Sequence, residues 1–112
     1  MMPFRARPVH VAKATLFRAL GHPARVRILE LLQEGERSVG SLQEALELES
    51  GGTSQHLAAL RRIGVVTSRR EGTSVYYRVA DDEVFVLLAA GRTIVAHALE
   101  RQQDVLEDIA TE

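Results

Sequence analysis

Residues 41–64 constrain the fold of this 112-residue chain more than any other stretch, because they predict two short helices separated by glycines. In the first half, Leu42 and Leu46 have the spacing of one helical face. Ser41, with Glu44 three residues later, forms the pattern of a capping box. This pattern predicts that the first of the two helices starts at Ser41.

The second half predicts an amphipathic helix. One face carries Thr53, Leu57, Leu60 and Ile63, and the other faces carry Ser54, Gln55, Ala58, Arg61 and Arg62. Two helices around a tight turn are typical of a helix-turn-helix, whose second helix enters the major groove of DNA. The same spacing also fits two helices of an ordinary helical core.

The segment after the second helix predicts a β-hairpin. Gly64 favours a helix end, and two β-prone runs follow between Val65 and Val79. The residues 71–74, Glu-Gly-Thr-Ser, favour a turn between these runs. A basic hairpin directly after a candidate recognition helix indicates a winged helix-turn-helix.

Four segments, in order, resemble three motifs of the ArsR family (also called ArsR/SmtB) of bacterial winged helix-turn-helix regulators. They are ALGHPARVRILELL at 19–32, SQHLAALRRIGVV at 54–66, and the hairpin segments RREG at 69–72 and VYYRV at 75–79. The resemblance covers roughly residues 15–80 and a final helix. It implies a mainly α fold with a small β-hairpin between the fourth and fifth helices. It also implies a homodimer formed through the first and last helices.

The length of the chain fits one domain. We expect a loose arm over residues 1–8 and a single winged helix-turn-helix domain over residues 9–112, with a dimerisation helix at about 81–109. The chain has no cysteine, which excludes disulfides and thiolate metal ligands. No apolar run of transmembrane length and no signal-peptide pattern is present, so we expect a cytoplasmic protein without a membrane partner.

Charge is segregated along the chain, although the net charge is only −1. Residues 1–30 carry six basic side chains against one acidic side chain, and residues 61–78 carry five against one. Residues 81–112 carry eight acidic side chains against two arginines. DNA phosphates respond to local surface charge, so the slightly acidic total does not exclude a nucleic-acid partner.

The predicted final helix has more apolar surface than one small domain can cover, with apolar residues recurring from Val84 to Ile109. We therefore expect it to pair with a second copy of the chain. The two recognition helices of a two-fold dimer would lie about one DNA turn apart. This arrangement predicts an inverted-repeat operator with half-sites roughly 10 bp apart.

Candidate DNA contacts come from the second helix of the motif and from the hairpin. We expect base contacts mainly from Ser54 and Gln55, because a Gln amide can pair with the edge of adenine. His56 could contact DNA or form a structural hydrogen bond, and Thr53 is expected to be half-buried. The arginines are expected to bind phosphates first. The complete set is Gly52, Thr53, Ser54, Gln55, His56, Arg61, Arg62, Arg69, Arg70, Thr73 and Ser74.

For three local features the sequence supports more specific predictions. Gly51 and Gly52 stand where family members usually have Ser, Gln or Thr. Either their bare backbone approaches phosphates or base edges, or the turn is longer and the helix starts later. The matching arginine of the family is often structural, so Arg25 is expected to form a salt bridge or a helix cap. Segments 10–20 and 23–32 predict the first two helices, and 34–38 predicts a turn.

Many family members sense metals, and the resemblance implies two places for a metal site. Ser38 and Gly40 stand where cysteine ligands would be. On the final helix, His97 and Glu100 could share Zn²⁺ or Ni²⁺, but the other expected ligand positions hold valines, Val84 and Val86. We therefore expect no metal or other cofactor, and His97 and Glu100 are the candidates if zinc or nickel is bound.

The sequence thus predicts a homodimeric regulator of transcription, most simply a repressor, that binds double-stranded DNA at an inverted repeat. One alternative is a zinc- or nickel-responsive regulator, or an activator that acts with a partner protein. Another is an adaptor that binds proteins and has lost DNA contact. An enzyme is not expected, because the chain has no ordered nucleophile-and-base motif, phosphate loop or metal cluster.

Overall fold

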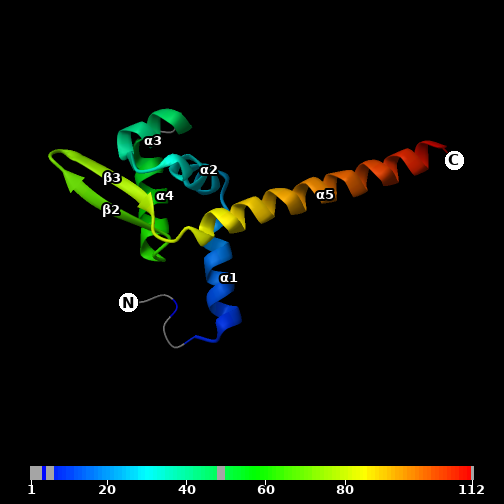
Figure 1. The fold of residues 1–112 in the computed structure, drawn as a ribbon, viewed down its shortest axis with the longest axis horizontal. Coiled ribbons are helices and arrows are strands. Elements are labelled where there is room, and N and C mark those ends of the chain that lie inside the picture. The colour runs from blue at the N-terminus through cyan, green and yellow to red at the C-terminus, as the bar shows by residue number, and fades with distance from the viewer. Residues whose placement is uncertain (1–3, 5–6, 48–49, 112) are drawn as a thin grey trace.

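The computed structural model describes residue 4 and residues 7–47 and 50–111, so most of the predicted arm lies outside the described residues. Five helices surround or extend from a small sheet (Figure 1). The elements are α1 (Val9–Leu20), α2 (Pro23–Leu31), the 3₁₀ turn η1 (Leu32–Glu34), β1 (Arg37–Ser38), α3 (Val39–Leu46), α4 (Ser50–Arg62), β2 (Val66–Glu71), β3 (Ser74–Val79) and α5 (Glu83–Thr111). No helix in this part of the chain combines the length and the apolar character needed to cross a membrane.

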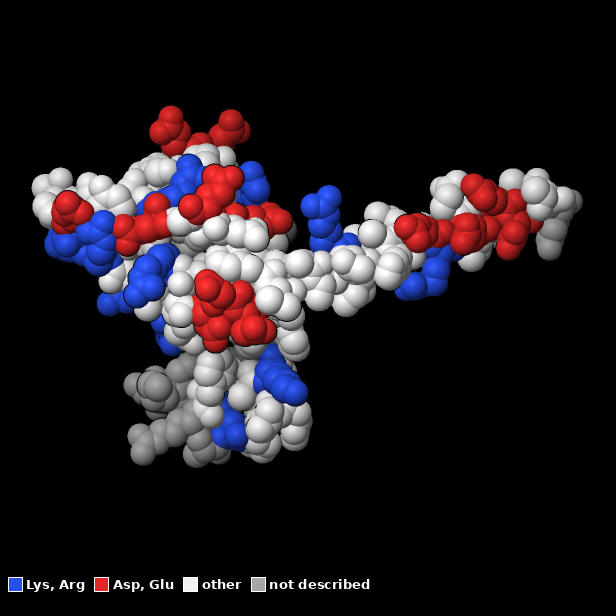
Figure 2. Space-filling model, viewed as in Figure 1, with Lys and Arg blue, Asp and Glu red and all other residues white. Residues whose placement is uncertain are grey.

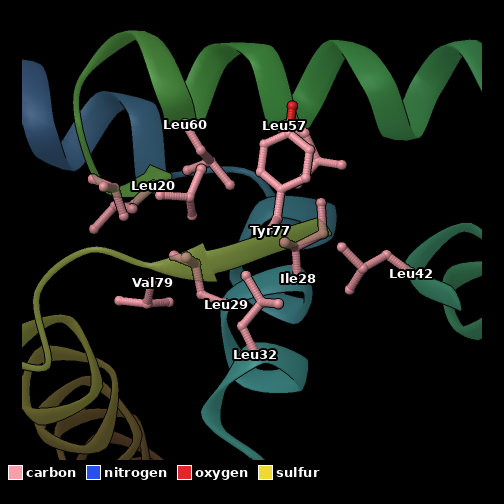
Figure 3. Close-up of a cluster of buried hydrophobic side chains, with 11 residues drawn as sticks. Leu20, Ile28, Leu29, Leu32, Leu42, Leu57, Leu60, Tyr77 and Val79 are labelled. Carbon is pink, nitrogen blue, oxygen red and sulfur yellow. The ribbon is translucent and has the colours of Figure 1, made fainter. Parts of the chain in front are cut away.

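The core lies between α2, α3, α4 and the sheet (Figure 3). Apolar side chains from each of these elements are buried together, and the ring of Tyr77 on β3 lies under α4. Tyr76, its neighbour on the strand, is only half-buried, as the alternation of strand side chains predicts. The buried cluster consists of Leu20, Ile28, Leu29, Leu32, Leu42, Leu57, Leu60, Val65, Val66, Tyr77 and Val79.

The capping box predicted at Ser41 is wrong, because α3 begins two residues earlier, at Val39. Ser38 is the N-cap, and its hydroxyl accepts a hydrogen bond from the Ser41 backbone N–H at 3.1 Å. The Ser41 hydroxyl instead accepts a hydrogen bond from Arg37 Nε at 2.9 Å. Ser38 has the extended backbone that an N-cap needs because it ends strand β1.

The predicted hairpin is confirmed, with β2 and β3 paired antiparallel from Val66↔Val79 to Glu71↔Ser74. Its turn has two residues, and Gly72 has a φ of +62°, which a residue without Cβ adopts readily. Where the sequence predicted only a turn at 34–38, the chain forms η1 and then β1, which pairs with the other edge of β3. The sheet therefore has three strands, in the order β1-β3-β2.

Helix α5 has 29 residues and would be about 43 Å long at the usual rise per residue. The side chain of Asp81 accepts a hydrogen bond from the Glu83 backbone N–H at 2.9 Å at its start. Only the beginning of α5 packs against the core, and the rest projects away from the body (Figure 1). Large apolar side chains are more than half exposed along this projecting part: Ile94, Val95, Leu99, Val105, Leu106 and Ile109.

Candidate nucleic-acid interface

Helix α4 has one completely buried face. Thr53, Leu57 and Leu60 have no exposed surface, since α2 and α3 pack against this side of the helix. The expected DNA contact by Thr53 is therefore wrong, because a fully buried side chain cannot touch a duplex. The Thr53 hydroxyl also has no hydrogen-bond partner among the described residues.

The opposite face of α4 is exposed to solvent. Ser54 and Gln55 are exposed in its first half, Ala58 follows one turn later, and Arg61 and Arg62 are exposed at its end. These side chains follow one another at helical spacing and form a polar and basic stripe. The stripe provides hydrogen-bonding groups at one end and two positive charges at the other.

The glycines lie inside α4, which begins at Ser50, so the alternative of a later helix start is wrong. A Cβ added at Gly52 would meet no atom within 4 Å. Packing within the protein therefore does not require a glycine there. Gly52 lies in the first turn of α4, and its lack of a side chain leaves room for a close approach from outside the protein.

His56 is tied to the protein. Its Nδ1 accepts a hydrogen bond from Arg25 Nε at 3.1 Å, and its ring lies 4.3 Å from the ring of His22. Arg25 also donates from Nη1 to the Ala19 carbonyl near the end of α1, at 3.1 Å, which confirms its expected role as a helix cap. Burial, followed by the charges of His22 and Arg25, lowers the pKa of His56. His56 therefore has a structural hydrogen bond, one of the two roles left open by the sequence.

The hairpin of β2 and β3, here called the wing, presents two arginines in different situations. Arg70 is exposed and forms no ion pair with the described residues, and Thr73 in the turn is exposed as well. Ser74, which begins β3, is half-buried. Figure 2 shows both basic and acidic side chains over the wing, and mostly acidic side chains along the far end of α5.

Arg69 contacts two carboxylates. Its Nη2 lies 2.6 Å from an oxygen of Glu36, and its Nη1 lies 2.6 Å from an oxygen of Glu71. Its guanidinium carbon lies 4.7 Å from the centre of the Tyr76 ring. The hydrogen bonds of Arg69 lower the pKa of Glu36 and, together with those to Glu71, raise the pKa of Arg69. No sequence signal indicated Glu36, because 33 residues separate it from Arg69.

The metal candidates on α5, His97 and Glu100, are both exposed. Within the described part of the chain, no three His, Asp or Glu side chains are grouped so that they could hold a metal ion.

An apolar hollow of about 640 Å³ lies where α1 and α2 meet the first half of α5. Its walls are mostly aliphatic, and Phe17, which is 53% exposed, forms part of its rim. The hollow continues into the exposed apolar side chains of α5. Its lining includes Phe17, Leu20, Val26, Leu87, Leu88, Gly91, Ile94 and Val95.

This arrangement, a helix with one buried and one polar face followed by a basic hairpin, defines a winged helix-turn-helix DNA-binding protein. Residues 22–68 match the model of a family described as bacterial regulatory protein, arsR family. The HTH-type transcriptional regulator Rv0081 of Mycobacterium tuberculosis is 47% identical over 103 residues, which cover 91% of this chain and 90% of that protein. The chain belongs to the ArsR family and is a transcriptional regulator, not an enzyme.

Solved structures show the same fold. The crystal structure of Rv0081 matches with a TM-score of 0.78 and 45% identity, covering 87% of this chain and 98% of that one. A solution structure from Mycobacterium bovis, described as a homodimeric winged helix-turn-helix DNA-binding domain, matches with a TM-score of 0.73 and 35% identity, covering 83% and 86%.

Two further relatives differ in the direction of regulation that their names state. The biofilm growth-associated repressor of Agrobacterium fabrum is 40% identical over 77 residues, covering 69% of this chain and 66% of that protein. The transcriptional activator HlyU of Vibrio cholerae is 42% identical over 78 residues, covering 69% and 72%.

Proposed function

We propose that this regulator binds an inverted-repeat operator as a homodimer and represses transcription by blocking access of the polymerase. The observation that carries the proposal is the exposed stripe of α4, which presents Ser54 and Gln55 in its first half and two exposed arginines at its end, while the opposite face is fully buried. A helix arranged in this way can enter the major groove without disturbing the core.

The proposed contacts divide into two kinds. Ser54 and Gln55 contact base edges, and Gly52 lets the backbone of α4 approach the DNA closely. The side chains that contact the phosphate backbone lie at the end of α4 and in the wing: Arg61, Arg62, Arg70, Thr73 and Ser74.

The dimer is proposed to form through α1 and α5. The exposed apolar side chains of α5 continue from the hollow beside α1, and a second copy would remove both from water. Charge supports the same pairing, because α1 carries Lys13 and Arg18, whereas the far half of α5 carries Glu100, Asp104, Glu107 and Asp108 against Arg101. The homodimeric relative from M. bovis provides a precedent for self-association.

Repression is proposed because it requires only occupancy of the operator. The named relatives include both a repressor and an activator, so the direction of regulation needs a direct measurement.

Selection of bound sequences from random double-stranded DNA, with the full chain, tests the proposal. We expect an inverted repeat with half-sites roughly 10 bp apart, and a protein that sediments as a dimer without DNA. Transcription from a promoter that contains the selected sequence should fall when the protein is added. Selection of a single half-site, a monomer at micromolar concentration, or increased transcription would each contradict the part of the proposal that it addresses. Parallel selections with Zn²⁺ or Ni²⁺ would show whether either metal changes the result.

A further inference from the structure

We propose that Arg69 is a positioning residue that fixes the wing to the body of the protein, and that it is not a ligand of DNA phosphate. This inference rests on the proposed DNA-binding function and changes the role expected for Arg69 from the sequence. Arg70, its neighbour, remains the arginine of the wing that binds phosphate.

Every nitrogen of the Arg69 guanidinium has a carboxylate partner. Nε donates to both oxygens of Glu36, at 3.0 and 2.9 Å, and Nη2 donates to Oε1 of Glu36 at 2.6 Å. Nη1 donates to Oε2 of Glu71 at 2.6 Å. One face of the guanidinium lies over the Tyr76 ring. Two of the five guanidinium N–H groups remain without a carboxylate acceptor, but a phosphate that used them would have to approach two ionised carboxylates.

The charges favour the same conclusion. Glu36 and Glu71 together bring two negative charges to the single positive charge of Arg69, so this cluster does not attract a phosphate as an isolated arginine would. The hydrogen bonds from Arg69, with a smaller effect of the Arg78 charge, lower the pKa of Glu36. Glu36 therefore stays ionised at neutral pH and keeps its hold on Arg69.

The place of Arg69 in the sheet explains what this contact does. Arg69 pairs with Tyr76, and Tyr76 also pairs with Ser38, the last residue of β1. β1 pairs with β3 only at Tyr76 and Tyr77, so the outer part of the wing, Arg70–Val75, consists of only two strands. A two-stranded hairpin alone is marginally stable, so its angle depends on how it is held where the third strand ends. Arg69 makes that connection, since Glu36 precedes β1 and Tyr76 is on β3.

DNA binding measured against salt separates the two roles of arginine. Arg70→Ala should reduce the slope of log K against log salt concentration by about 0.9, the value for one lost phosphate contact. Arg69→Ala and Glu36→Ala should each weaken binding about two- to fivefold and leave the slope unchanged. Arg69→Lys keeps the positive charge but loses the planar guanidinium, which can donate to two carboxylates at once. It should therefore weaken DNA binding as much as Arg69→Ala does.

Three results in this experiment would overturn the proposal. A reduced slope for Arg69→Ala would make Arg69 a phosphate ligand. A Glu36→Ala variant that bound DNA more tightly and with a steeper slope would show that Glu36 only masks such a ligand. Unchanged affinity in both variants would show that the contact does not position the wing for DNA.

Hydrogen exchange without DNA tests the contact even if the operator is never found. Amides of the outer wing, residues 70–75, should exchange faster in Arg69→Ala and Glu36→Ala than in the wild-type protein. Arg70→Ala is the matched control and should leave this exchange unchanged. Equal exchange in all four proteins would overturn the proposal independently of any result with DNA, and failure of the wild-type protein to bind DNA would instead contradict the proposed function.

Discussion

Two arginines, Arg25 and Arg69, attach the two DNA-facing elements to the body of the protein in different ways. Arg25 holds α4 through neutral acceptors, an imidazole nitrogen of His56 and the Ala19 carbonyl. Arg69 holds the wing through the carboxylates of Glu36 and Glu71. The attachment of α4 is therefore expected to depend on the protonation of a histidine, whereas that of the wing depends on ionic strength.

The largest expected effect is the loss of the Arg25 contacts. Arg25→Ala removes two hydrogen bonds and leaves the acceptor of His56 without its donor, so the free energy of unfolding should fall by about 1–3 kcal/mol. Urea denaturation followed by circular dichroism measures this change. Arg27→Ala is the matched control, because Arg27 is exposed and has only a 3.7 Å ion pair with Glu30. If the control lost as much stability, the proposed importance of Arg25 would be wrong.

A change on the buried face of α4 should have a smaller effect of opposite sign. Thr53→Val removes a buried hydroxyl that has no partner among the described residues and replaces it with a methyl group of similar size. The free energy of unfolding should rise by about 1 kcal/mol. DNA affinity should not change, because Thr53 is fully buried. A loss of affinity without a loss of stability would restore Thr53 as a DNA contact.

The pH dependence of stability should reveal the attachment of α4. Burial, with the charges of His22 and Arg25, lowers the pKa of His56 from its ordinary value of 6.5. The unfolded chain therefore takes up this proton at higher pH than the folded chain does. The stabilisation is complete above pH 6.5 and is lost as pH falls through the lowered pKa. In thermal unfolding at a series of pH values, His56→Gln should show a smaller loss toward acid, since an amide oxygen can accept from Arg25 without titrating. An unchanged pH profile would contradict this assignment.

The smallest effect is expected from salt. Raising the salt concentration from about 0.1 M to about 1 M shortens the screening length from about 10 to about 3 Å, which weakens exposed ion pairs. Hydrogen exchange should therefore become faster in the outer wing, which depends on the carboxylates, and remain the same in α4. Equal acceleration in both elements would remove the proposed difference between the two attachments.

The sequence predicted the elements that have a clear period or turn. The hairpin was expected from its turn residues, and the final helix, predicted at 81–109, extends over Glu83–Thr111. The start of α3 was missed because Ser38 and Ser41 can both cap a helix, and only the pairing of β1 decides between them. A strand of two residues is too short to show alternation in the sequence.

Within the candidate site, the sequence could predict which side chains are exposed where the helical spacing of apolar residues defines the buried face, as for Ser54 and Gln55. The sequence placed Thr53 on the Leu57 face but could not show that its burial is complete, because this depends on how α2 and α3 meet α4. The partners of Arg69 and His56 were not predictable either. Glu36 and Arg25 are 33 and 31 residues away, and only the tertiary fold brings each of them into contact.

The unbroken course of α5 has a consequence for how operator geometry is set. Because one continuous helix carries both the residues packed on the core and the exposed apolar residues beyond them, it should act as a stiff lever between the two copies of the proposed dimer. A change in the angle between the two α5 helices of the proposed dimer would change the distance between the two α4 helices. The side chains that face DNA would themselves stay the same. DNA affinity measured with operators that carry single base pairs inserted between the half-sites would then show how rigid the contact between the two α5 helices is.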